Sequence, residues 1–144
     1  MPEKSKTELL KILHERMQKE QQEYRKWLLA QRKNEILKLA PQYYVREQVI
    51  KEIGESEPTG KIGERYLYTE QITVLLRSRT PLADICHEYF SDIDLYSQYE
   101  FAESARAAID NCANALLREE FRERRSKGIY THEPNNTYIT EENT

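Results

Sequence analysis

The chain has 144 residues, a net charge of −3 at pH 7 and 33% charged residues, with only four glycines and five prolines. This length suits one domain with its own core, and so little glycine and proline favours helix. The absence of an apolar leader and of any run of about 18 apolar residues argues against secretion and membrane spanning, so we expect a cytoplasmic protein.

The first predicted helix spans residues 7–31, and it is the element around which we expect the fold to be organised. Ser5 and Glu8 have the spacing of a capping box, in which each side chain satisfies a main-chain amide of the first turn. The apolar residues of this segment share one face of a helical wheel. They are Leu9, Leu10, Leu13, Met17, Tyr24, Trp27 and Leu28.

Trp27 is the only tryptophan, and we expect it to anchor the core because burying an indole removes a large apolar area from water. An exposed Trp27 would instead indicate a partner site. Glu20 and Gln21 interrupt the apolar face near its middle. This interruption predicts an exposed section, where the element that packs against the helix ends.

Residues 36–40 form a short apolar turn before Pro41. Proline disfavours helical geometry in the residue before it, which predicts a corner. A further helix is expected over residues 43–53, with Gly54 as its C-cap. Residues 54–63 contain three glycines and almost no hydrophobic residues, and they read as a loop.

The second half of the chain predicts a short extended segment at residues 65–68 and then a helix of about two turns capped by Thr69. Thr80 and Pro81 mark the start of another helix, and residues 91–95 read as a turn. A second long helix follows from about Phe101 through the basic run at residues 118–125. Its small residues would let the first helix approach closely. They are Ala102, Ala105 and Ala108.

The predicted fold class is therefore mainly α, an irregular helical bundle organised around two long helices. We expect residues 1–127 to form a single helical domain. Residues 128–144 are rich in Thr, Asn and Glu and read as a tail or a small β-hairpin. A frayed tail is favoured, since a lone hairpin is marginal in water.

No catalytic or metal-binding pattern is recognisable. The three histidines lie in different segments, and Cys86 and Cys112 are too far apart for a metal-binding box and fit apolar helical patterns. The sequence lacks a phosphate-binding loop, a dinucleotide fingerprint and a nucleophile elbow. We therefore expect no enzyme activity, no cofactor and no metal, although catalytic residues can also assemble from scattered positions.

Charge is distributed unevenly along the chain. Residues 1–53 carry 12 Lys or Arg against 8 acids, whereas residues 54–112 carry 5 against 11. Basic and aromatic side chains gather around the first predicted corner, a combination found in protein interfaces and in single-stranded nucleic-acid sites. The candidate partner-binding residues are Arg25, Arg32, Lys33, Tyr43, Tyr44 and Arg46. We expect either Tyr43 or Tyr44 to point into the core.

Three segments resemble a family of small bacterial domains of unknown function that are often associated with mobile elements. They read YRKWLL at residues 24–29, YVRE at 44–47 and PLADI at 81–85, within a similar order of helices over about residues 8–122. The resemblance implies no catalytic residues. By analogy at the level of the fold, it suggests an inhibitor of a host defence nuclease, of the anti-CRISPR kind.

The leading hypothesis is a non-enzymatic protein-interaction or regulatory module. The alternative is a nucleic-acid-binding protein that uses the basic N-terminal half, against which the acidic middle of the chain counts. A homodimer is a further expectation, because two helices of about 25–30 residues would overhang a compact monomer and expose part of an apolar stripe.

Overall fold

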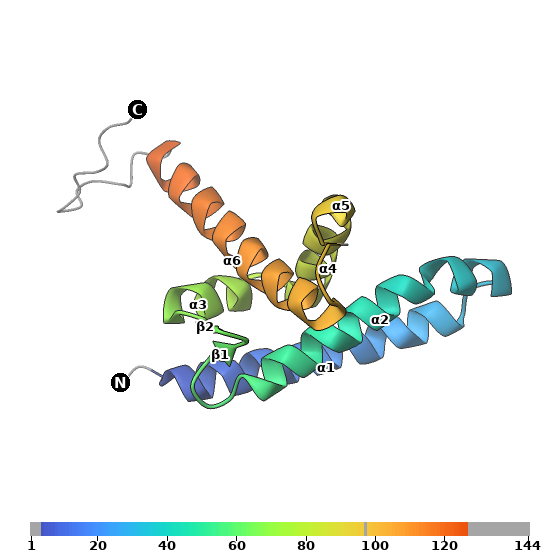
Figure 1. Cartoon of the computed structure of the whole chain (residues 1–144), viewed down its shortest axis with the longest axis horizontal. Coiled ribbons are helices and arrows are strands. Elements are labelled where there is room, and N and C mark those ends of the chain that lie inside the picture. Colours follow the sequence, from blue (N-terminus) through green and yellow to red (C-terminus); the bar gives the residue numbers. More distant parts are fainter. Residues whose placement is uncertain (1–3, 97, 127–144) are drawn as a thin grey trace.

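The computed structural model describes residues 4–96 and 98–126, and these form a mainly helical bundle, as predicted (Figure 1). The elements in chain order are α1 (Lys6–Leu29), α2 (Lys33–Glu55), β1 (Lys61–Ile62), β2 (Arg65–Tyr66), α3 (Thr69–Arg77), α4 (Pro81–Ser91), α5 (Ile93–Tyr96) and α6 (Phe101–Ser126). The two long helices of the prediction are α1 and α6. A third, α2, has nearly the same length. The proposed C-terminal tail or hairpin at residues 128–144 lies outside the described residues.

The start of α1 is the capping box that the sequence predicts. The Glu8 amide donates to Ser5 Oγ at 3.1 Å, and the Ser5 amide donates to Glu8 Oε1 at 2.9 Å. Leu10, Leu13 and Met17 are completely buried. The apolar face of the first half of α1 is therefore covered by the rest of the bundle.

The predicted corner at Pro41 is wrong, because α2 is one helix of 23 residues with Pro41 inside it. A proline costs a helix one main-chain hydrogen bond and crowds the preceding turn. Here α1 packs along α2 and keeps the segment helical. Gly54 is likewise inside the helix and not its C-cap. A Cβ atom at that position would lie 2.7 Å from Nε2 of His14, so this glycine leaves room for the His14 imidazole between α1 and α2.

Between α2 and α3 the chain forms a small antiparallel pair, in which Lys61 lies opposite Tyr66 and Ile62 opposite Arg65. Gly63 makes the turn with a φ of 64°, a left-handed conformation that suits glycine. Only part of the predicted extended segment at residues 65–68 is a strand. Thr69 is the first residue of α3 and not the N-cap predicted from the sequence. The N-cap is Tyr68, whose amide donates to Gln71 Oε1 at 2.8 Å.

The next helix, α4, begins as predicted, with Thr80 at the N-cap and Pro81 in the first turn. The expected turn at residues 91–95 is partly helical, because the four-residue helix α5 begins within it at Ile93. The first helix contributes to both ends of the α3–α4 connection. Arg16 of α1 donates to the Ser78 carbonyl at 2.7 Å, while Glu20, one turn later, accepts from the first amides of α4. A cation thus meets the negative end of α3 and an anion the positive end of α4.

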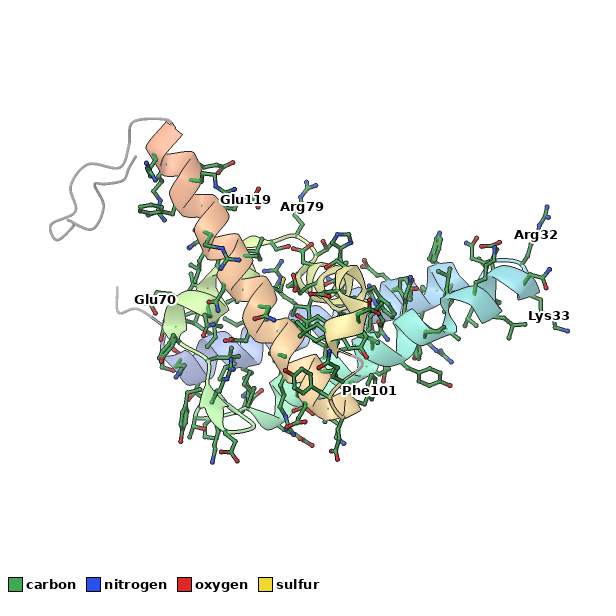
Figure 2. All side chains as sticks on the ribbon, turned by 45° about the horizontal axis from the view of Figure 1, so that its top comes forward. Arg32, Lys33, Glu70, Arg79, Phe101 and Glu119 are labelled. Carbon is green, nitrogen blue, oxygen red and sulfur yellow. The ribbon has the colours of Figure 1, made fainter. Side chains whose placement is uncertain are left out.

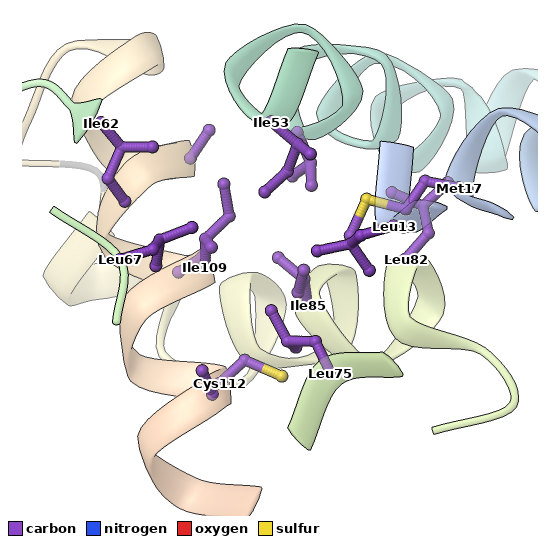
Figure 3. Packing of buried hydrophobic residues seen from close by; sticks show 14 of the residues in the cluster. Leu13, Met17, Ile53, Ile62, Leu67, Leu75, Leu82, Ile85, Ile109 and Cys112 are labelled. Carbon is purple, nitrogen blue, oxygen red and sulfur yellow. The ribbon is translucent and has the colours of Figure 1, made fainter. Parts of the chain in front are cut away.

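The core lies where α1, α2, α3, α4 and α6 meet, and Figure 3 shows Leu13, Met17 and Leu82 on one side of it and Leu67 and Ile109 on the other. Ala105 and Ala108 of α6 are completely buried. We expected these small residues to pack mainly against α1, and this expectation is wrong. The main neighbours of α6 are α2, α3 and α4, because these helices already cover the apolar face of α1.

Among residues 4–96 and 98–126, every helix is too short or too polar to span a bilayer.

Candidate interaction surface

The most prominent surface feature is the end of the α1–α2 hairpin, residues 24–40, which we call the hairpin tip. Figure 1 shows the turn between these helices projecting beyond the other elements, at the opposite end from α3. Below the tip, α4 holds the hairpin on both of its helices. The Leu82 and Ala83 amides donate to the Glu20 carboxylate at 3.0 and 2.9 Å, and Cys86 Sγ lies 3.9 Å from the Gln42 carbonyl oxygen.

Large apolar side chains are exposed at the hairpin tip. Trp27 is 50% exposed, Leu29 59% and Leu37 68%. The prediction that Trp27 anchors the core is therefore wrong. The helix continues past the point where α4 supports it, so α2 is the only one of the described elements against which its last turns pack. Trp27 contacts the half-buried Tyr24, with ring centroids 5.7 Å apart.

The hairpin tip is also strongly basic. It contains five Lys or Arg residues and a single acid, Glu35, so its net charge is +4. All five basic side chains are exposed, and Lys38 Nζ lies 3.8 Å from Glu35 Oε2. Figure 2 shows Arg32 and Lys33 at the very end of the hairpin, with their side chains directed outward. The basic residues are Arg25, Lys26, Arg32, Lys33 and Lys38.

The two candidate tyrosines differ in exposure. Tyr44 is exposed and lies two helical turns from Leu37, on the same face of α2. Tyr43 is half-buried, and the Tyr43 and Tyr44 rings meet edge to face with centroids 6.1 Å apart. Tyr44 thus extends the exposed apolar surface beyond the hairpin tip, while Tyr43 faces partly inward.

Arg46 is not part of any exposed surface, contrary to its prediction as a partner-binding residue, because only 5% of it is exposed. Its Nε donates to Gln21 Oε1 at 2.8 Å, its Nη2 lies 3.8 Å from Glu20 Oε2, and its guanidinium carbon stands 3.9 Å from the centre of the Tyr24 ring. Burial lowers the pKa of Arg46, and the nearby Glu20 opposes this shift. Arg46 therefore connects α2 to α1 inside the fold and is not available to a partner.

Glu20 and Gln21 are not the exposed section that the sequence predicts. Gln21 is buried, and its Nε2 donates to Glu47 Oε2 at 2.9 Å. The Glu20 carboxylate joins α1 to both α4 and Arg46, and burial raises its pKa despite the two amide hydrogen bonds. The sequence signal for this contact was the presence of two polar residues, Glu20 and Gln21, inside an apolar stripe. Their partners, however, come from residues that are remote in the sequence.

The structure thus separates the six sequence-predicted residues. Arg25, Arg32 and Lys33 lie exposed on the hairpin tip, and Tyr44 lies exposed just beyond it. Tyr43 is half-buried and Arg46 is buried. Sequence reasoning missed Leu29 and Leu37 as surface residues, because an apolar residue in a helix is usually assigned to the core.

A concave surface lies between the β1–β2 turn and the start of α6. It is an open cleft of about 490 Å³. The basic side chains along it are already bonded to carboxylates: Arg65 Nη1 to Asp110 Oδ2 at 2.7 Å, and Arg106 Nε to Glu52 Oε1 at 2.8 Å. The lining residues are Ile62, Gly63, Glu64, Arg65, Tyr99, Glu103, Arg106 and Ala107.

Among the described residues, no three His, Cys, Asp or Glu side chains are grouped so that they could hold a metal ion. Both cysteines are buried thiols that fill space in the core. Burial raises the pKa of Cys86 to about 11 and that of Cys112 to about 12.

These raised pKa values make the thiols poor nucleophiles. Since only the thiolate reacts readily with disulfide reagents, Cys86 and Cys112 of the folded chain should react with Ellman's reagent at least about 100-fold more slowly than those of the urea-unfolded chain. The absorbance of the released thionitrobenzoate measures both rates. Equal rates for the folded and unfolded chains would contradict the buried positions.

Comparison with known proteins places the chain in a family but not in a functional class. No curated protein and no solved structure matches it significantly. A family model described as "Protein of unknown function (DUF3848)" matches residues 9–117. This match contains α2 to α5 and most of α1 and α6, and with them the whole hairpin tip. The chain therefore belongs to the DUF3848 family of proteins of unknown function.

Proposed function

We propose that the chain is a non-enzymatic protein-interaction module of the cytoplasm and that the hairpin tip is its contact surface. The observation that carries this proposal is the exposure of Trp27, Leu29 and Leu37 at the end of a projecting hairpin. Exposed apolar side chains gathered at one place are characteristic of protein-binding surfaces, and tryptophan is enriched among the residues that dominate binding energy.

The charge of the hairpin tip favours one kind of partner. A net charge of +4 favours a protein surface that is acidic around an apolar depression. Arg25, Arg32 and Lys33 would steer and orient the encounter, while Trp27 would supply the buried anchor. The resemblance to domains of mobile elements makes a host defence nuclease the first partner to test, with the chain acting as its inhibitor.

The second candidate is a single-stranded nucleic acid. The combination of five basic residues with an exposed indole favours it, because cations hold phosphates and aromatic rings stack on bases. The burial of Arg46 removes one of the cations that this function was expected to use. Between the two candidates, the exposed leucines favour the protein partner, since aliphatic side chains offer little to phosphates or to base edges.

Site-specific photo-crosslinking separates the two candidates. A benzoylphenylalanine at Asn34, on the hairpin tip, should capture a specific protein from a lysate of the source organism, and the product should survive nuclease treatment. The same group at Lys19, on the exposed side of α1 below the tip, is the matched control. Products that disappear with nuclease would favour nucleic acid, and equal products from both positions would contradict a contact surface at the tip.

Truncating the apolar residues of the hairpin tip should weaken binding without unfolding the protein. For Trp27→Ala we expect binding of the captured partner to weaken by about 30-fold, the effect of losing an interface anchor. The free energy of unfolding should fall by only about 1 kcal/mol, because half of the indole is already in water. Biolayer interferometry and urea denaturation measure the two effects.

Tyr66→Ala is the matched control, because Tyr66 on β2 is 51% exposed and lies outside the hairpin tip. Its replacement should leave binding within about twofold of the unsubstituted chain. If Tyr66→Ala and Trp27→Ala weaken binding equally, the contact surface is not the hairpin tip.

A further inference from the structure

A second group of exposed apolar side chains lies across α5 and the start of α6. Ile93, Leu95, Tyr99 and Phe101 are each at least 36% exposed, although they fall within nine consecutive residues. Figure 2 shows Phe101 on the near surface at the start of α6. Such a concentration of exposed apolar residues is larger than single scattered side chains would give, and it indicates a contact surface.

This surface is acidic. Residues 92–103, which we call the acidic segment, contain four acids and neither Lys nor Arg. The acids are Asp92, Asp94, Glu100 and Glu103, and all four are exposed. The basic residues of the adjoining cleft, Arg65 and Arg106, do not offset this charge toward a ligand, because each is bonded to a carboxylate of its own.

The acidic segment and the hairpin tip are complementary in charge and alike in apolar character. Their net charges are −4 and +4, and each exposes at least three large apolar side chains. Within one copy they do not meet, since Figure 1 shows the tip projecting away from α5. Only a second copy of the chain can bring a tip onto an acidic segment.

We propose that the chain associates with itself by docking the hairpin tip of one copy on the acidic segment of another. Arg32 and Lys33 meet the acids of the segment, and Trp27 covers the apolar side chains around Ile93. Because the two surfaces differ, one such contact leaves a tip and a segment open. Two reciprocal contacts close the pair into a symmetric dimer.

Self-association would regulate the proposed function, because it covers the surface that a partner protein needs. The two ideas share the exposed hairpin tip but differ in what it contacts. Self-association depends on the acidic segment, which the binding of an external partner does not use. It is measured on the purified chain alone, so either idea can fail without the other.

The test is sedimentation equilibrium of the full chain at low and high salt. We expect a mass above that of the monomer at high micromolar concentration in about 50 mM salt, with association at least about tenfold weaker in about 500 mM salt, where screening shortens the reach of the charges. A monomeric mass under both conditions would overturn the proposal.

Charge reversal identifies the surfaces. The tip variant Arg32→Glu with Lys33→Glu, and the segment variant Asp94→Lys with Glu103→Lys, should each remain monomeric. An equimolar mixture of the two should associate again, because the unsubstituted tip meets the unsubstituted segment in one contact and the reversed charges at positions 32, 33, 94 and 103 meet in the other. Lys11→Glu with Lys19→Glu, on exposed positions of α1 below the tip, is the control and should associate as the unsubstituted chain does. Failure of the mixture to associate would contradict the pairing.

A second measurement needs no substitution. A carbodiimide joins a lysine to a carboxylate only where the two are in contact, and an equal mixture of ¹⁴N- and ¹⁵N-labelled chains distinguishes links between copies from links within one. We expect mixed-isotope peptides that join Lys33 to Asp92 or Asp94. Mixed-isotope links made only by other lysines would overturn the proposal.

Discussion

Replacing Arg46 with methionine should lower the free energy of unfolding by about 3–5 kcal/mol, the usual effect of removing one partner from a buried charged pair. The substitution leaves the Glu20 carboxylate beside α4 without its cation and Gln21 Oε1 without its donor. It also removes the guanidinium that packs 3.9 Å from the centre of the Tyr24 ring. Urea denaturation followed by circular dichroism measures the loss.

Arg25→Met is the matched control, because Arg25 has the same chemistry on an exposed turn of α1 and should change stability by no more than about 0.5 kcal/mol. The double variant Glu20→Gln with Arg46→Met should lose less than the sum of the two single variants, since neither charge is then left without its partner. Additive losses would show that Glu20 and Arg46 act independently.

Replacing Leu13 with alanine should cost about 2–5 kcal/mol, in the range of other leucines truncated in a close-packed core. Leu13 is completely buried on α1, and Figure 3 shows it beside Met17 and Leu82. The cost combines the lost transfer of apolar atoms from water with the cavity that remains. The midpoint of urea unfolding should fall, with the slope of the transition unchanged.

Leu37→Ala is the comparison, because the same side chain is removed from a position that is 68% exposed. Its stability should stay within about 0.5 kcal/mol of the unsubstituted chain, since alanine is also a good helix former. A loss from Leu37→Ala as large as that from Leu13→Ala would mean that the hairpin tip is packed against something in the free protein.

The features of this fold that could be predicted are those determined by residues close together in the sequence. The capping box at Ser5, the start of α4 at Pro81 and the apolar stripe along the first half of α1 are local patterns, and the structure contains all three. The continuity of α2 was not predictable in the same way. The effect of Pro41 depends on how well another helix supports the segment, and that support comes from α1.

The site was harder to predict, because helical periodicity says which residues share a face but not how far along the helix that face is covered. Leu13 and Trp27 belong to the same stripe of α1, yet the first is buried and the second lies beyond the reach of α4. Glu20 and Gln21 look like a break in the stripe for the same reason. Their partners, Arg46 and the first amides of α4, lie more than 20 residues away in sequence.

The proline inside α2 has a consequence for recognition. A proline has no amide hydrogen, so the carbonyl of Leu37, four residues earlier, cannot receive the main-chain hydrogen bond that residue 41 of an uninterrupted helix would give it. This carbonyl belongs to one of the most exposed apolar residues of the hairpin tip. A helix surface ordinarily offers little besides side chains, because each carbonyl accepts from the amide four residues later; at Leu37 that amide hydrogen is missing. A docked molecule that donates a hydrogen bond to this carbonyl oxygen would be held in one orientation, which charge and apolar contact alone do not fix.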